Sequence, residues 1–192
     1  MENIKNAIRI LNEGGIVIFP TDTAFGVGCR IDNQDAVEKL FKIRKRPLGQ
    51  AVPVLVKDAN MAQYYLQSIP EKVKRELMDR YWPGALTIVL PCRVENVFKL
   101  VRGGGNSLGV RMPDHETALF LIGGAGVPIL GPSANFHGGK TPYRFEDLDR
   151  NFVKMVDYVV PGECSLKNAS TVIDCSKNEW RTIRKGAITI NL

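Results

Sequence analysis

Histidine is scarce in this sequence, and cysteine is not arranged for metal binding. There are two histidines, His115 and His137, and none of the four cysteines belongs to a C-x-x-C pair. A structural zinc site is therefore not expected, because such sites take four ligands from closely spaced cysteines and histidines. Disulfides are not needed either, since 192 residues with 44% hydrophobic content can bury a substantial core.

Long apolar runs are also missing. Glu2 follows Met1 directly, and the longest apolar stretches have the length of a β-strand. The sequence shows no internal repeat and no linker rich in Pro, Gly or Ser. We therefore expect a single domain over residues 1–192, without a membrane segment and located in the cytoplasm.

Two common functional motifs are present only in part. Gly139-Lys140-Thr141 matches the end of a phosphate-binding P-loop, yet Ala134 stands where that motif requires glycine. His115-Glu116 matches the start of a zinc-protease helix, yet Leu119 stands at the place of the second histidine. Neither class of enzyme is expected.

Positive charge is in excess. Lys and Arg together number 26 against 20 Asp and Glu, which gives a net charge of +6. This balance favours polyanionic partners, such as a nucleotide or an RNA. Charge alone does not choose between them.

Helical and strand-like patterns alternate along the chain. Apolar spacing predicts helices over residues 4–11, 36–41 and 117–122, and Asp58 and Pro70 mark the starts of two more. Strands are predicted at residues 16–19, 51–56, 86–90, 108–110, 127–130, 156–160, 171–173 and 180–183. The alternation predicts an α/β fold, and the short connections late in the chain favour one twisted mixed sheet with flanking helices.

Polar or basic turns follow several of these elements. Pro20-Thr21-Asp22-Thr23 follows the first strand, and Ser133-Ala134-Asn135 follows a later one. In each, the side chains either satisfy the turn's own backbone or face a substrate. Arg44-Lys45-Arg46 ends a helix, where it is either a solvated basic face or a pair of guanidinium groups held for phosphate by Pro47.

Taken in order, these segments resemble the YrdC family of threonylcarbamoyl-AMP synthases, in its stand-alone, single-domain form. The resemblance covers nearly the whole chain. It rests on Gly14-Gly15, Pro20-Thr21-Asp22-Thr23, Gly26-Val27-Gly28, Arg46-Pro47, Trp82-Pro83-Gly84-Ala85-Leu86-Thr87, Val110-Arg111-Met112-Pro113, Pro132-Ser133-Ala134-Asn135, Ser170-Thr171-Val172-Ile173-Asp174 and Ile183-Arg184-Lys185-Gly186.

The resemblance implies a YrdC-like fold with a concave, basic surface that holds a nucleotide. It implies a nucleotidyltransferase that converts L-threonine, bicarbonate and ATP to threonylcarbamoyl-AMP and pyrophosphate, for the threonylcarbamoyladenosine of tRNA. ATP is then a substrate, and Mg²⁺ is held mainly by its phosphates, with no protein ligand named. Transferase proteins act downstream on tRNA, and direct RNA binding by this chain stays open.

The resemblance also implies roles for particular residues. Those that fall where the family contacts threonine are Thr23, Arg111, Ser133 and Ser170. Those that fall where it contacts ATP are Arg46, Gln50, Ser107, Asn135, Tyr143 and Arg184. Arg44 and Arg46 are expected to act in catalysis by offsetting charge on the triphosphate.

Three positions depart from the family pattern. Arg44 replaces the usual lysine, which exchanges a point charge for a planar fork. Leu55 stands where many relatives carry a histidine near threonine, and Tyr143 stands where Thr or Ser is more common near ATP. These changes bear on affinity more than on the type of reaction.

Two other functions stay open on the sequence alone. The basic surface could bind RNA without catalysis, although aromatic and basic residues are not interleaved as they are on base-stacking surfaces. The chain could also act on a different acyl or carbamoyl substrate, as the related domain does inside larger carbamoyltransferases.

Overall fold

The strands form two hydrogen-bonded sheets in the computed structural model, which describes residues 2–190. The three-stranded sheet has the order β2-β1-β7, with β1 at Val17–Phe19, β2 at Gly26–Gly28 and β7 at Tyr158–Val159. The six-stranded sheet has the order β6-β3-β5-β4-β8-β9, with β3 at Val54–Leu55, β4 at Leu86–Pro91, β5 at Ser107–Arg111, β6 at Ile129–Leu130, β8 at Thr171–Asp174 and β9 at Arg181–Arg184. Both sheets contain parallel and antiparallel pairs, which confirms the predicted mixed α/β class.

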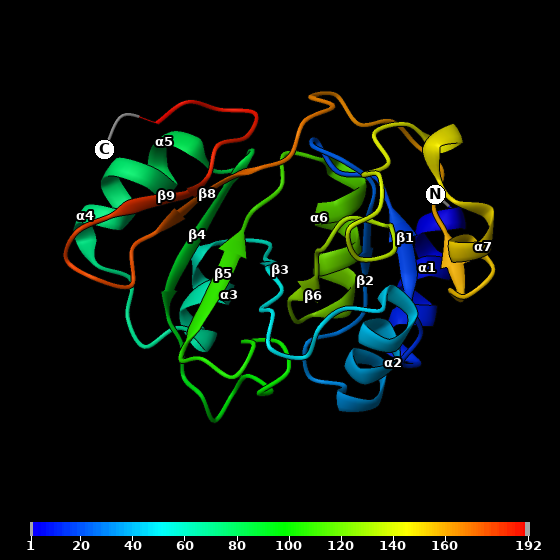
Figure 1. The fold of residues 1–192 in the computed structure, drawn as a ribbon, viewed down its shortest axis with the longest axis horizontal. Coiled ribbons are helices and arrows are strands. Elements are labelled where there is room, and N and C mark those ends of the chain that lie inside the picture. The colour runs from blue at the N-terminus through cyan, green and yellow to red at the C-terminus, as the bar shows by residue number, and fades with distance from the viewer. Residues whose placement is uncertain (1, 191–192) are drawn as a thin grey trace.

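The two sheets are joined by the chain that surrounds β2 and β6. Leu130 N donates to Cys29 O at 2.9 Å, and Val27 N donates to Pro132 O at 2.9 Å. Figure 1 shows the strands following one another across the width of the molecule, from β9 and β8 through β3 and β6 to β1. The prediction of one sheet is therefore corrected to two sheets that meet at this junction.

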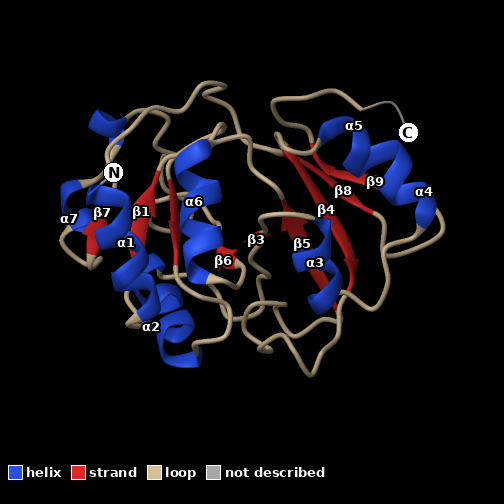
Figure 2. Ribbon diagram, turned by 180° about the vertical axis from the view of Figure 1, so that it is seen from behind, coloured by secondary structure: helices blue, strands red, loops and turns tan. Residues whose placement is uncertain are grey.

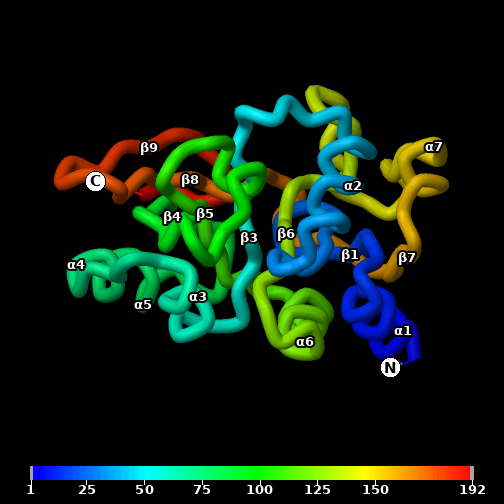
Figure 3. The backbone as a smooth tube through the Cα atoms, turned by 90° about the horizontal axis from the view of Figure 1, so that it is seen from below, coloured from blue at the N-terminus to red at the C-terminus, as the bar shows by residue number. Residues whose placement is uncertain are grey.

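Helices cover both faces of the sheets (Figure 3). They are α1 (Glu2–Asn12), α2 (Gln34–Arg44), α3 (Ala59–Tyr65), α4 (Glu71–Val73), a π-helical turn (Lys74–Met78), α5 (Asp79–Tyr81), α6 (Glu116–Ala125), a 3₁₀ turn (Phe145–Asp147) and α7 (Arg150–Val153). Seen from below, α1, α3, α4, α5 and α6 lie along one side of the strands and α2 lies on the other (Figure 3). None of the helices within residues 2–190 is long and apolar enough to span a bilayer.

The core follows from alternation along β1. Val17 and Phe19 pack with α1 and α6, whereas Ile16 and Ile18 pack with α2 on the other face. Because successive side chains of a strand point to opposite faces, this short run is buried on both sides and fixes α1 and α2 across it. Figure 2 shows α1 and α6 side by side next to β1. The polar turn after β1 is thereby held at a fixed place.

Candidate functional site

Strand ends from both sheets meet around a cavity of about 160 Å³. Seven residues that the sequence singled out line it together: Thr23, Arg44, Arg46, Arg111, Ser133, Ser170 and Arg184. They come from positions far apart in the chain, and four of the seven are arginines. The structure therefore brings these residues into one electropositive hollow, and their roles toward ligands stay predictions.

The turn after β1 uses its two threonines differently. Thr21 Oγ1 accepts from the backbone N–H groups of Thr23 and Ala24, each at 3.2 Å, and donates to Ala24 O at 2.7 Å. This hydroxyl satisfies the turn itself, which was one of the two interpretations of the sequence. Thr23 Oγ1 instead accepts from Arg111 Nη1 at 2.7 Å and lies beside the cavity.

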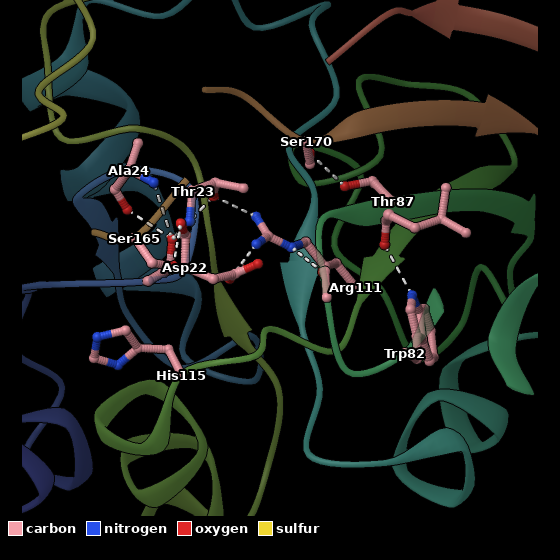
Figure 4. A network of polar contacts seen from close by, with 12 residues as sticks. Asp22, Thr23, Ala24, Trp82, Thr87, Arg111, His115, Ser165 and Ser170 are labelled. Atoms are coloured by element: carbon pink, nitrogen blue, oxygen red, sulfur yellow. Dashed lines mark hydrogen bonds and ion pairs between the residues drawn. The ribbon is translucent and has the colours of Figure 1, made fainter. Parts of the chain in front are cut away.

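Arg111 is held at the end of β5 by contacts on all three of its nitrogens. Nε donates to Gly84 O at 2.9 Å, Nη1 donates to Thr23, and Nη2 forms an ion pair with Asp22 (Figure 4). Burial lowers the pKa of Arg111, and the neighbouring Asp22 carboxylate opposes that shift. Two of the five guanidinium N–H groups stay available for a ligand, in a fixed orientation.

Arg44 is a second buried cation of the cavity. Arg44 is 4% exposed, and its Nε donates to Asn135 O at 3.1 Å. Nη1 is buried with no partner among the described residues. Burial, with a further contribution from Arg46, lowers the pKa of Arg44 to about 10. The middle residue of this basic run, Lys45, is exposed, so the run is only in part a solvated face.

Arg46 lies beside Arg44 and closes the loop that follows α2. Its Nε donates to Gln50 O at 3.1 Å, and its Nη2 donates to Ala51 O at 2.5 Å. Burial lowers the pKa of Arg46 as well. No carboxylate of the described residues pairs with Arg44 or Arg46, so this side of the cavity carries uncompensated positive charge.

A chain of hydrogen bonds connects Arg184 to Thr87, near the start of β4. Arg184 Nη2 donates to Ser170 Oγ at 2.9 Å, and Ser170 Oγ lies 2.9 Å from Thr87 Oγ1. Arg184 Nε also donates to Ser170 O at 2.9 Å, so the guanidinium group binds both the side chain and the backbone of Ser170. Thr87 is 3% exposed and lines the cavity with its neighbours (Figure 4).

Four predicted ATP ligands do not line this cavity: Gln50, Ser107, Asn135 and Tyr143. Asn135 lies directly behind Arg44, and its amide donates to two backbone carbonyls while Oδ1 is buried without a partner. Ser107 begins β5, at the opposite end from Arg111. Tyr143 lines a neighbouring cavity of about 290 Å³. The proposed contacts of these residues with ATP stay predictions.

Asp22 and Thr87 were not singled out as site residues from the sequence. Asp22 is 2% exposed and pairs with Arg111, and Thr87 joins the hydroxyl chain. Each had a signal: an acid in the turn after a buried strand, and a hydroxyl near the start of an apolar strand. Among residues 2–190, no group of three or more His, Cys, Asp or Glu side chains is placed to hold a metal ion.

Comparison with known proteins relates the chain to threonylcarbamoyl-AMP synthases. The family model Sua5_yciO_yrdC, described as "Telomere recombination", matches residues 9–186. The threonylcarbamoyl-AMP synthase of Bacillus subtilis is 37% identical over 190 residues, which cover 97% of this chain and 54% of that protein. The chain therefore spans about half the length of this relative.

Solved structures show the same fold. The crystal structure of P. abyssi Sua5 complexed with L-threonine has a TM-score of 0.90 and 33% identity, and the match covers 95% of this chain and 54% of that one. The crystal structure of E. coli YciO has a TM-score of 0.84 and 26% identity, with 95% and 88% covered. Since the family model extends over nearly the whole described chain, the protein belongs to the Sua5/YciO/YrdC family.

Proposed function

We propose that this chain forms threonylcarbamoyl-AMP and pyrophosphate from L-threonine, bicarbonate and ATP. The observation that carries the proposal is the meeting of four arginines at one cavity, three of them without an ion-pair partner among the described residues. Such a site favours a polyanion such as triphosphate. The named synthases among the relatives and the threonine complex of P. abyssi Sua5 support the choice of reaction.

In this proposal, different residues of the cavity bind the two substrates. Arg111 would bind the carboxylate of threonine with its free N–H groups, beside Thr23, Ser133 and Ser170. Arg44, Arg46 and Arg184 would bind phosphate oxygens, with Gln50, Ser107, Asn135 and Tyr143 as further ATP contacts. An enclosed volume of about 160 Å³ is smaller than the ~300–1,000 Å³ usual for ligand pockets, so the nucleotide would extend beyond it.

The chemistry needs no protein nucleophile. The amine of threonine first bonds to the carbon of bicarbonate, and water is lost to give a carbamate. An oxygen of the new carboxylate then bonds to the α-phosphorus of ATP, the bond from that phosphorus to the bridging oxygen breaks, and pyrophosphate leaves. Positioning and neutralisation of charge by Arg44 and Arg46 would supply the acceleration, as is usual in transfers at phosphorus.

Mg²⁺ would enter with the nucleotide. The cavity lining offers hydroxyl and guanidinium groups but no carboxylate, because Asp22 is buried behind Arg111. Mg²⁺ prefers few protein ligands and keeps phosphate and water oxygens, which fits this lining. The ion would help pyrophosphate to leave by offsetting its charge. The product would pass to transferase proteins that act on tRNA, and the basic surface could also contact RNA directly.

The decisive assay is release of pyrophosphate from ATP, measured with threonine or bicarbonate left out in turn. We expect release to require both, and Arg44→Ala to abolish it. Arg181→Ala is the control for loss of one positive charge, because this arginine lies on β9 and pairs with Asp174 away from the cavity. Release that is unchanged without threonine would exclude the proposed reaction.

A second candidate is the same transfer to a different amino acid. Leu55 is 2% exposed and lines the cavity where many synthases carry a histidine. An apolar side chain there removes a polar contact, which weakens selection for a hydroxyl-bearing substrate. Replacing threonine by serine, valine or isoleucine in the same assay decides between the two, because a true threonine enzyme prefers threonine over its isostere valine.

A further inference from the structure

Asp22 is the only acid among the described residues that pairs with an arginine of the cavity. The carboxylate is 2% exposed and Arg111 is 6% exposed, so both charges are removed from water. Asp22 Oδ2 is buried and has no hydrogen-bond partner among the described residues. A buried carboxylate with an unused oxygen is costly to maintain, which calls for a reason beyond stability.

The backbone of the same turn keeps Asp22 in place. Asp22 O accepts from Leu166 N at 2.8 Å and from Ser165 Oγ at 3.3 Å, which ties the turn to the loop before β8. Arg111 is in turn fixed by Gly84 O and by Thr23 Oγ1. The backbone of Asp22 and the guanidinium group of Arg111 are therefore each held by contacts besides the ion pair.

The ion pair makes Arg111 electrostatically different from the other arginines of the cavity. Arg111 is neutralised by Asp22, whereas Arg44, Arg46 and Arg184 have no such partner among the described residues. Arg111 and Arg184 are close enough to repel each other, so without Asp22 the positive charge would extend across the whole cavity. A phosphate group carries more charge than a carboxylate and would then bind at either end.

We propose that Asp22 is a specificity-determining residue that keeps phosphate groups away from Arg111 and reserves this end of the cavity for an amino acid. The proposal rests on the proposed function. An amino acid brings one carboxylate and one ammonium group, so a neutral ion pair accommodates it without excess charge. A pyrophosphate or triphosphate at the same place would face the Asp22 carboxylate across one guanidinium group and would be repelled.

The test is calorimetric binding of inorganic pyrophosphate and of L-threonine, without turnover. The wild-type protein should bind one pyrophosphate, and threonine should bind with the same affinity whether or not pyrophosphate is present. Displacement of threonine by pyrophosphate in the wild-type protein would overturn the proposal. This measurement uses only the wild-type protein, so it tests the proposal even if substitutions at Asp22 prevent folding.

Asp22→Asn should bind a second pyrophosphate, and pyrophosphate should now weaken threonine binding at least about tenfold, the size expected for loss of an interaction with a charged group. Asp174→Asn is the matched control, because Asp174 is also nearly buried and paired with an arginine, on β8 away from the cavity. It should keep the wild-type pattern. A purely structural role for Asp22 would weaken both ligands and create no second site, which would also overturn the proposal.

The two proposals fail in different ways. If the wild-type protein binds one pyrophosphate but no threonine, the assignment of threonine fails, and the count of pyrophosphate molecules on Asp22→Asn still tests the role of Asp22. If threonine-dependent pyrophosphate release is observed but Asp22→Asn binds a single pyrophosphate, the proposed reaction is supported and the proposed role of Asp22 is wrong.

Discussion

At the scale of single residues, Arg44 carries a buried charge that lowers the stability of the ligand-free protein and is available to bind an anion. The residue is 4% exposed, and its Nη1 has no hydrogen-bond partner among the described residues. We expect Arg44→Met, which keeps an unbranched apolar stem, to raise the free energy of unfolding of the ligand-free protein by about 1–2 kcal/mol, because an uncompensated buried charge is removed. Urea unfolding with and without pyrophosphate measures this. Pyrophosphate should stabilise the wild type but not the variant, and a variant less stable than the wild type would contradict the argument.

The same residue predicts a pH dependence. In the folded protein the pKa of Arg44 is about 10, below that of an unperturbed arginine. The unfolded chain therefore keeps this proton to higher pH, and the folded state loses its buried charge first. The stability advantage of Arg44→Met should be full below pH 10 and should shrink as the pH rises through about 10. Unfolding of both proteins between neutral pH and pH 11 checks this, and a constant difference would exclude it.

The division of ligands predicts opposite effects of two matched substitutions. Arg111→Lys should raise the KM for threonine about tenfold and leave the KM for ATP nearly unchanged, because lysine keeps the charge but loses the fork that grips a carboxylate. Arg184→Lys should do the reverse. Steady-state pyrophosphate release with each substrate varied in turn measures both KM values. Equal effects of a substitution on the two KM values would contradict the assignment of Arg111 to threonine and Arg184 to ATP.

The site was predictable from the sequence only in part. Thr23, Arg111 and Arg184 could be named because they belong to recognisable segments, and they do meet at one cavity. The pairing of Asp22 with Arg111 could not be foreseen, because it depends on a contact between a turn and the end of β5, far apart in the chain. No local pattern reports which of several acids will meet a given arginine.

At the scale of elements, α2 carries Arg44 to the cavity and its ends fix where that residue lies. Asn33 Oδ1 accepts from Ala36 N at 2.9 Å at the N-terminus, and Lys45 takes a left-handed conformation, with φ of 51°, at the C-terminus. Asn33→Ala should lower the midpoint of thermal unfolding by about 2–4 °C, since a lost cap costs about 1 kcal/mol. Asn33→Asp retains an acceptor and should match the wild type, and an equal loss in both variants would show that the cap does not matter.

The helices were easier to predict than the strands. α1, α2 and α6 follow from the 3.6-residue spacing of their buried positions. The strand expected at residues 51–56 is limited to Val54–Leu55, because Pro53 has no N–H to donate. β2 was not predicted, since Gly26-Val27-Gly28 has little intrinsic preference for a strand and forms one by pairing with β1.

At the scale of the whole molecule, the junction between the two sheets depends on Gly28. A Cβ atom at this position would lie 2.2 Å from Leu130 O, a backbone atom that cannot turn aside. Gly28→Ala should therefore lower the free energy of unfolding by about 1–3 kcal/mol and reduce pyrophosphate release, because it separates the two sides of the cavity. Denaturant unfolding and the release assay measure the two effects. Gly105→Ala is the control, since its Cβ would lie 3.5 Å from the nearest atom, and a similar loss there would refute the role of the junction.

The α/β class could be predicted because alternating patterns survive along the whole chain. The division into two sheets could not, because it depends on which backbone groups pair between β2 and the segment that contains β6. Local sequence sets which elements form, and their long-range pairing sets how many sheets they make.

Arg184 lies on β9, the last strand of the described chain, while Thr23 follows the first. A ribosome making this protein therefore synthesises Thr23, Arg44 and Arg111 long before it reaches Arg184. A nascent chain that extends only as far as β5 already contains Arg44 and Arg111 but lacks Ser170 and Arg184, so nucleotide capture has to await the synthesis of β8 and β9. Messages that terminate before β9 would yield a polypeptide with much of its core and an incomplete phosphate site.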